Sequence, residues 1–137
     1  MRVIGLFLVA GLMMAQAPSY EAVANTRQIM QGMVDPASRA IAAAAKEPPA
    51  DDRGWMMAGT QATLLAESMQ LLNIGGRAKD HEGWLKASNA MSDAAMAVAK
   101  AAEVKDAAAF QSAAANITAG CQGCHRTYRP RPAQKKQ

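Results

Sequence analysis

The stretch KDAAAFQSAAANITAGCQGCHRTYR, residues 105–129, decides the fold. Its apolar and cysteine side chains recur every three or four residues, which is the spacing of one face of an α-helix. The members of this stripe are Phe110, Ala114, Ile117, Cys121, Cys124 and Tyr128. Lys105-Asp106 marks the predicted start, and Pro130 lies just beyond the end because proline cannot continue a helix. The stretch therefore predicts a long final helix that carries both cysteines of the chain.

Three more helical segments are predicted upstream, over residues 20–46, from 51 or 52 to 72, and from 80 to about 104. The clusters Glu47-Pro48-Pro49 and Asn73-Ile74-Gly75-Gly76 separate them. Aromatic residues make up only 4% of the chain and alanine dominates its apolar half, so strands have little to be built from. Short connections between long amphipathic helices favour antiparallel neighbours. The predicted fold is all-α, an antiparallel up-down-up-down four-helix bundle.

Pro36 falls inside the first of these segments. Proline removes one donor of the helical ladder and crowds the preceding turn. We therefore expect either a kink near Val34 and Asp35, or a restart with Asp35 as N-cap and Pro36 at the first helical position.

The two ends of the chain differ in composition from its middle. Residues 1–17 combine Arg2, an apolar run and Ala15-Gln16-Ala17, the order of a cleaved signal peptide. Residues 130–137 form a basic tail, which leaves 18–129 as the bundle domain. No segment reaches the roughly 18 consecutive apolar residues of a membrane span. We therefore expect an exported, periplasmic protein with no stable membrane insertion. Acidic residues slightly outnumber basic ones over 18–125, so we expect no basic face for nucleic acid.

The most specific signal is Cys121-Gln122-Gly123-Cys124-His125, a Cys-x-x-Cys-His sequence. This is the pattern for covalent attachment of a c-type haem. Two thiols three residues apart on a helical turn can reach the two vinyl groups of one haem edge. The adjacent imidazole can then bind the iron. The motif predicts one covalent haem c, held through Cys121 and Cys124, with His125 as a metal ligand.

Other interpretations of the motif account for less of it. A Cys121–Cys124 disulfide suits an oxidising compartment, yet it leaves His125 unexplained and closes only a tiny loop. A thioredoxin-like pair normally follows a strand, and none is predicted here. Structural zinc requires four ligands, and His81 is the only other histidine. The disulfide without haem stays open as a structural alternative.

With these features, the chain resembles the class II c-type cytochromes, which include cytochrome c′ and its low-spin relatives. The resemblance covers the whole mature chain in organisation, and its specific motifs lie at the two ends. It implies that haem sits within one end of the bundle, with the last helix supplying the thioethers and the proximal ligand His125. It also implies that Arg129, one turn after His125, lies near the haem propionates.

The resemblance further implies a role for the first helix. Low-spin members place a methionine ligand there after an Arg-Gln pair, and this chain has Arg27-Gln28-Ile29-Met30. Met30 is therefore the predicted second axial ligand, with Arg27 and Gln28 as candidate haem contacts. Met33 competes because residues three apart share a face of a regular α-helix. Five-coordinate members have an apolar residue in place of the ligand.

These residues lead to a functional hypothesis. We expect a periplasmic, non-enzymatic carrier of single electrons between redox protein partners. The alternative is a five-coordinate, gas-binding protein of the cytochrome c′ type. The sequence has neither the residue order of a Ser-His-Asp catalytic triad nor a phosphate-binding glycine loop, so no motif indicates an enzyme. Trp84 and Trp55 are predicted to form core or haem walls, and homodimerisation is left open.

Overall fold

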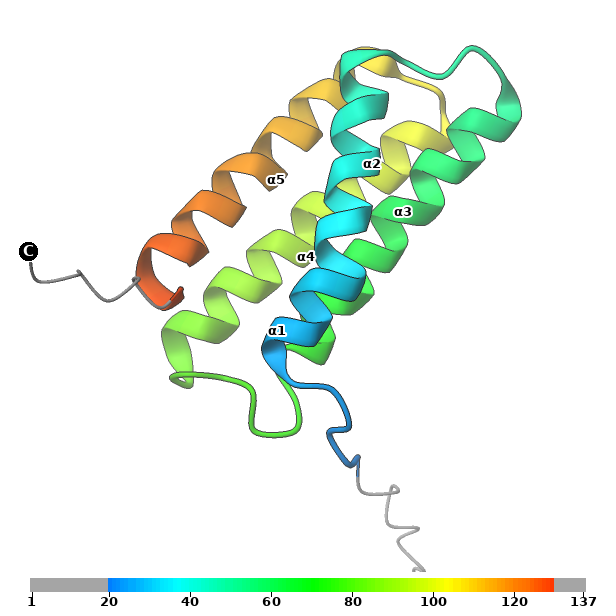
Figure 1. Ribbon diagram of the computed structural model, residues 1–137. Helices are drawn as coiled ribbons and strands as arrows, with labels where there is room; N and C mark the ends of the chain where they lie inside the picture. The colour runs from blue at the N-terminus through cyan, green and yellow to red at the C-terminus, as the bar shows by residue number, and fades with distance from the viewer. Residues whose placement is uncertain (1–19, 130–137) are drawn as a thin grey trace, which may run out of the picture.

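A computed structural model describes residues 20–129, so the predicted signal peptide and basic tail lie outside the described residues. Within this range four long helices pack antiparallel (Figure 1), which confirms the predicted all-α bundle. The first helix consists of α1 (Thr26–Ile29), a π-helical turn η1 (Met30–Val34) and α2 (Asp35–Lys46), and the others are α3 (Asp52–Leu71), α4 (Glu82–Glu103) and α5 (Ala107–Tyr128). No helix within residues 20–129 is long and apolar enough to cross a membrane.

The first helix begins later than predicted, at Thr26 instead of Tyr20. The reason is a capping box at Asn25. Its side chain accepts a hydrogen bond from the Gln28 N–H, and the Gln28 side chain accepts one from the Asn25 N–H, both at 2.9 Å. These bonds satisfy backbone donors that a helix start leaves unpaired. Val23, two residues before this cap, is 94% exposed.

Pro36 neither kinks this helix sharply nor restarts it after a break. The backbone stays right-handed helical from Met30 through Asp35, and η1 replaces one α-turn directly before the proline. In this turn the Asp35 N–H donates to the Met30 carbonyl, five residues back. The wider turn accommodates the proline ring, which would otherwise crowd the preceding turn. The predicted restart, with Asp35 as N-cap and Pro36 at the first helical position, is therefore wrong: α2 begins at Asp35, Val34 is its N-cap residue, and Pro36 is its second residue.

The other helices begin close to the predicted positions. Asp51 and Asp106 cap α3 and α5 by accepting hydrogen bonds from backbone N–H groups at 2.7 and 2.9 Å. Asp80, predicted to open the third helix, lies two residues before α4 and accepts the Trp84 N–H at 3.0 Å. After α3, Gly75 and Gly76 both adopt positive φ, a conformation that glycine takes without strain.

Arg77 fixes the α3–α4 loop at one end of the bundle. It is only 6% exposed, and its guanidinium donates to the carbonyls of Ala24, Leu71 and Ile74 at 2.8–3.0 Å. Since Leu71 ends α3 and Ala24 precedes α1, this one side chain ties two helix ends together. The beginning of α4 and the end of α5 lie at the same end of the bundle (Figure 1).

Candidate haem site

The last turns of α5 present the motif at the end of the bundle that Arg77 ties together. Cys121 and Cys124 are half-buried, whereas His125 is exposed. Both cysteines are free thiols. Because α5 continues to Tyr128, residues 121, 124 and 125 lie on adjacent turns of one regular helix, as the spacing predicts. Two thiols and one imidazole are therefore available from a single rigid element.

A small apolar cavity adjoins these three side chains. Its volume is about 40 Å³, and η1, α3, α4 and α5 all contribute to its wall. The remaining lining residues are Met30, Val34, Met69, Leu72, Trp84, Ala87, Ser88 and Met91. Met91 packs closely on Gly120, so a Cβ atom at position 120 would displace the flexible Met91 side chain. The structure thus brings Cys121, Cys124, His125 and Met30 around one cavity.

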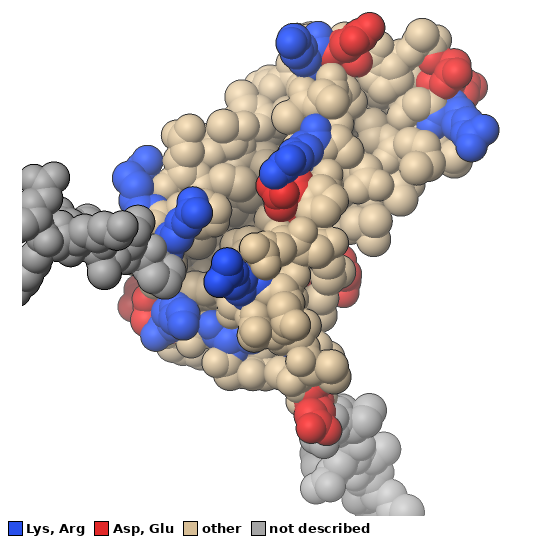
Figure 2. Space-filling view, viewed as in Figure 1, with Lys and Arg blue, Asp and Glu red and all other residues tan. Residues whose placement is uncertain are grey.

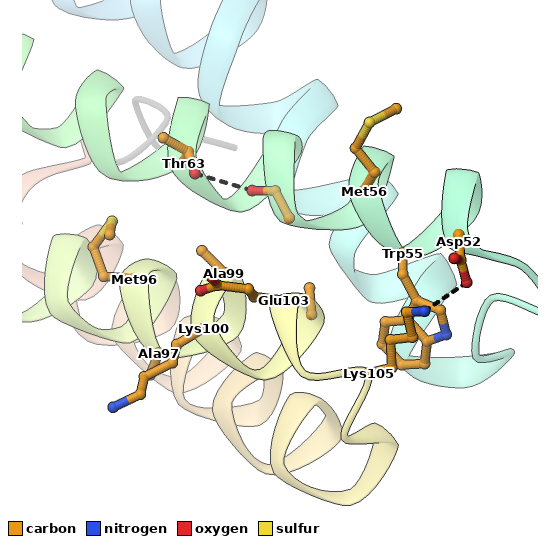
Figure 3. A pocket seen from close by; sticks show the side chains of 12 residues that line it. Asp52, Trp55, Met56, Thr63, Met96, Ala97, Ala99, Lys100, Glu103 and Lys105 are labelled. Atoms are coloured by element: carbon orange, nitrogen blue, oxygen red, sulfur yellow. Dashed lines mark hydrogen bonds and ion pairs between the residues drawn. The ribbon is translucent and has the colours of Figure 1, made fainter.

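A larger hollow lies open at the other end of the molecule, between α3 and α4 (Figure 3). It measures about 830 Å³, with Met56, Trp55 and Met96 on its walls, and a Lys105–Asp52 ion pair of 2.6 Å at its edge. None of its lining residues is a cysteine or histidine. The smaller cavity is therefore the candidate site, because donor chemistry decides the binding of a metal cofactor more than volume does.

Burial raises the pKa of both thiols above the ordinary cysteine value, and for Cys121 the neighbouring Cys124 adds to the increase. Both are therefore protonated near neutral pH. Reactive, redox-active cysteines have the opposite property, a lowered pKa that favours the thiolate. The environment of Cys121 and Cys124 does not match that of a thioredoxin-like pair.

The structure distinguishes Met30 from Met33 as ligand candidates, which the sequence alone did not. Met30 lines the cavity, whereas Met33 is 38% exposed and does not. The π turn explains the difference, because its wider spacing rotates Met33 away from the face it would share with Met30 in an α-helix. Sequence reasoning overlooked Met69 and Met91, which are 3% and 4% exposed and also reach the cavity. Their places in the buried stripes were the only available signal.

Comparison with known proteins bears on this arrangement. A protein-family model described as Cytochrome C' matches residues 77–129, the segment that contains α4, α5 and the Cys-x-x-Cys-His motif. The chain matches the cytochrome c′ family over this segment. The match confirms the resemblance to class II c-type cytochromes and supports a c-type haem protein. No curated protein and no solved structure matches the chain.

The donor set of the cavity suits a covalently attached haem c. Cys121 and Cys124 offer two thiols, His125 offers an exposed imidazole, and the lining is otherwise almost wholly apolar. The cavity volume of about 40 Å³ is close to one water molecule's share of liquid, roughly 30 Å³. A porphyrin is far larger, so the lining side chains would have to move apart before the cavity could hold one.

The three remaining residues implied by the resemblance do not line the cavity. Arg27 is exposed on α1, and Arg129 is the exposed C-cap of α5, where its N–H donates to the His125 carbonyl at 3.2 Å. Gln28 uses its side-chain oxygen in the capping box, which leaves its NH₂ group free to donate elsewhere. The roles of these three residues as haem contacts stay predictions.

Asp80 and Tyr128 join α4 to the end of α5 beside the cysteines. The Tyr128 hydroxyl donates to the Asp80 carboxylate at 2.6 Å, and the Tyr128 ring packs edge-on against Trp84 with centroids 5.0 Å apart. This hydrogen bond lowers the pKa of Asp80, helped by the Trp84 N–H. The same bond raises the pKa of Tyr128 to about 12. Sequence reasoning did not foresee the pair, because it joins residues 48 positions apart.

We expect Asp80→Asn and Tyr128→Phe both to destabilise this end of the bundle. A lowered carboxyl pKa contributes stability above the unfolded value near 3.8, and that contribution is lost as the pH falls below it. A raised phenol pKa contributes stability below about 10 that is lost between about 10 and 12. Urea unfolding, followed by helical circular dichroism at each pH, measures both. Equal pH profiles for wild type and Tyr128→Phe between pH 10 and 12 would contradict the assignment.

Proposed function

We propose that the protein is a periplasmic carrier of single electrons, with one covalent haem c for which His125 and Met30 would be the iron ligands. The observation that carries the proposal is the position of Met30. It lies on the wall of the same cavity as Cys121, Cys124 and His125, but on a different helix. The export signal predicted from residues 1–17 supports the periplasmic location.

Each residue of the motif would perform a separate task. The Cys121 and Cys124 thiols would each add across one vinyl group, with an S–H bond broken, an S–C bond formed and the hydrogen passed to the other vinyl carbon. No oxidant would be needed for this addition. His125 and the Met30 thioether would be the protein ligands of the iron. Bound haem supplies the one-electron couple of its iron, and a methionine ligand raises the potential of that couple.

The surrounding residues suit electron transfer. Trp84 is 5% exposed and is fixed by a hydrogen bond from its indole N–H to the Leu72 carbonyl at 3.0 Å. Val34 and Leu72 complete an apolar wall between η1 and α3. Apolar walls exclude water and lower the local dielectric constant. Fewer water molecules and polar groups then have to reorient when the charge of the iron changes.

Gas binding at an open coordination site is the competing function, because the family match includes cytochrome c′ itself. Optical spectra of the purified holoprotein in both oxidation states distinguish the two. We expect a low-spin ferric spectrum with a weak sulfur-to-iron charge-transfer band, and slow uptake of carbon monoxide by the ferrous protein. A high-spin ferric spectrum with rapid uptake would favour gas binding and remove the support for electron transfer.

A further inference from the structure

The charged residues of the bundle are unevenly distributed along its length. Over residues 20–129 basic and acidic residues are equal in number, so this part of the chain carries no net formal charge. Yet the Lys and Arg side chains gather around the end of α5 and the beginnings of α1 and α4 (Figure 2). This is the end of the molecule where the haem site lies.

Five exposed side chains make up this basic patch, and none of them belongs to an ion pair of the described residues. They are Arg27, Lys79, Lys86, Arg126 and Arg129. Glu21, Glu67 and Glu82 are exposed at the same end, and Asp80 is a fourth carboxylate there, hydrogen-bonded to the Tyr128 hydroxyl and the Trp84 N–H. The buried Arg77 adds a sixth positive charge at this end. Basic residues therefore outnumber acidic ones by six to four at the end that carries the exposed His125.

The rest of the bundle shows the opposite balance. Both ion pairs found among residues 20–129 lie there, Arg39–Asp35 at 2.9 Å and Lys105–Asp52 at 2.6 Å. Further acidic residues lie at the helix ends there, among them Glu47 after α2, Glu103 at the end of α4 and Asp106 before α5. A molecule with one positive and one nearly neutral or negative end orients in the field of a charged partner.

We infer that the basic patch is the docking surface for an acidic redox protein, which meets this protein at its haem end. The inference rests on the proposed electron-carrier function. An acidic partner would be steered toward the short path to the haem, because the patch surrounds the motif that holds it. The alternative occupant is an anionic membrane surface, which shares the same charge but binds through lipid headgroups.

The first test uses two small redox reagents of opposite charge with the full-length holoprotein. In each reaction one electron passes from ferrous haem to the reagent, hexacyanoferrate(III) as the anion or tris(phenanthroline)cobalt(III) as the cation. We expect the stopped-flow rate with the anion to fall as ionic strength rises, and the rate with the cation to increase. These opposite slopes report positive charge at the place where electrons leave, since salt screens local attraction and repulsion.

Charge-reversal variants at the two ends of the bundle show which end causes the salt dependence of the anion reaction. Lys79→Glu with Lys86→Glu should slow the anion reaction about fivefold or more at about 0.01 M ionic strength. Lys46→Glu with Lys100→Glu changes the net charge equally at the far end and should leave the rate within about twofold. Equal effects of the two pairs would overturn the docking surface. A preparation without any haem band would instead overturn the proposed function itself.

Polyglutamate and vesicles distinguish the two occupants. Polyglutamate should slow the anion reaction of the wild type, and much less that of Lys79→Glu/Lys86→Glu. The variant Arg131→Gln/Lys135→Gln/Lys136→Gln, which neutralises the tail, should retain the polyglutamate effect. Loss of the effect in this variant would assign the interaction to the tail. Sedimentation with phosphatidylglycerol vesicles at 0.15 M ionic strength, without a polyglutamate effect, would assign the surface to membranes.

Discussion

Denatured Cys121→Ala/Cys124→Ala protein is expected to lose all of its haem, whereas the denatured wild type retains one haem per chain. The two thiols are the only cysteines of the sequence, so no other thioether could form. Each single substitution should leave one thioether and weaken retention. The readouts are the intact mass after acid denaturation and the absorbance of the haem that solvent extraction removes.

Gln122→Ala provides the matched control for the cysteine variants. It lies between the two cysteines on the same helix and is exposed, so it tests whether a disturbance of α5 alone releases haem. We expect full retention in this variant. A colourless wild-type chain whose mass is lower by two hydrogens would show a Cys121–Cys124 disulfide and refute haem attachment.

Met30→Ala should convert the ferric iron from low spin to high spin and lower the reduction potential. The substitution removes the only η1 thioether that reaches the cavity, and carbon monoxide then binds the ferrous protein without displacing a side chain. Absorbance, electron paramagnetic resonance and carbon monoxide kinetics measure the change. Met33→Ala is the control, and it should leave the spin state unchanged because Met33 points away from the cavity.

Met69 and Met91 require a different comparison, because both are buried in the core. Replacement by alanine should cost on the order of 2–5 kcal/mol in the free energy of unfolding. Met69→Leu and Met91→Leu keep most of the volume and remove the sulfur. We expect both leucine variants to remain low-spin. A high-spin spectrum in one of them, with Met30→Ala still low-spin, would transfer the ligand role to that methionine.

Much of the fold was predictable because local signals decided it. The three-to-four-residue spacing through Phe110, Ile117 and Cys121 defined α5, and Asp106 marked its start. Pro49 and Gly75 marked two of the breaks. The sequence motif also gave the positions of both thiols and the imidazole on one helix, since their relation depends on helix geometry alone.

Other features of the site depend on contacts between distant segments. The Asp80–Tyr128 hydrogen bond and the three carbonyls around Arg77 join elements far apart in the chain, and no local pattern encodes such pairs. The start of the first helix was misplaced because the Asn25–Gln28 capping box outweighed the apolar spacing that extended back to Tyr20. The separation of Met30 from Met33 required the π turn, which regular periodicity excludes.

The π turn also determines how the first helix would respond to the deletion of one residue. Such a turn holds one residue more than an α-turn, and Gly32 within it is exposed with open space around its Cα. Removal of Gly32 would turn the Asp35–Met30 hydrogen bond into an ordinary α-helical bond between residues four apart, and so restore an uninterrupted α-helix. Met30 would keep its orientation relative to α2, because the two ends of the turn already lie one above the other. The extra residue therefore changes the positions inside the turn, Met33 among them, and leaves the place of Met30 at the cavity independent of it.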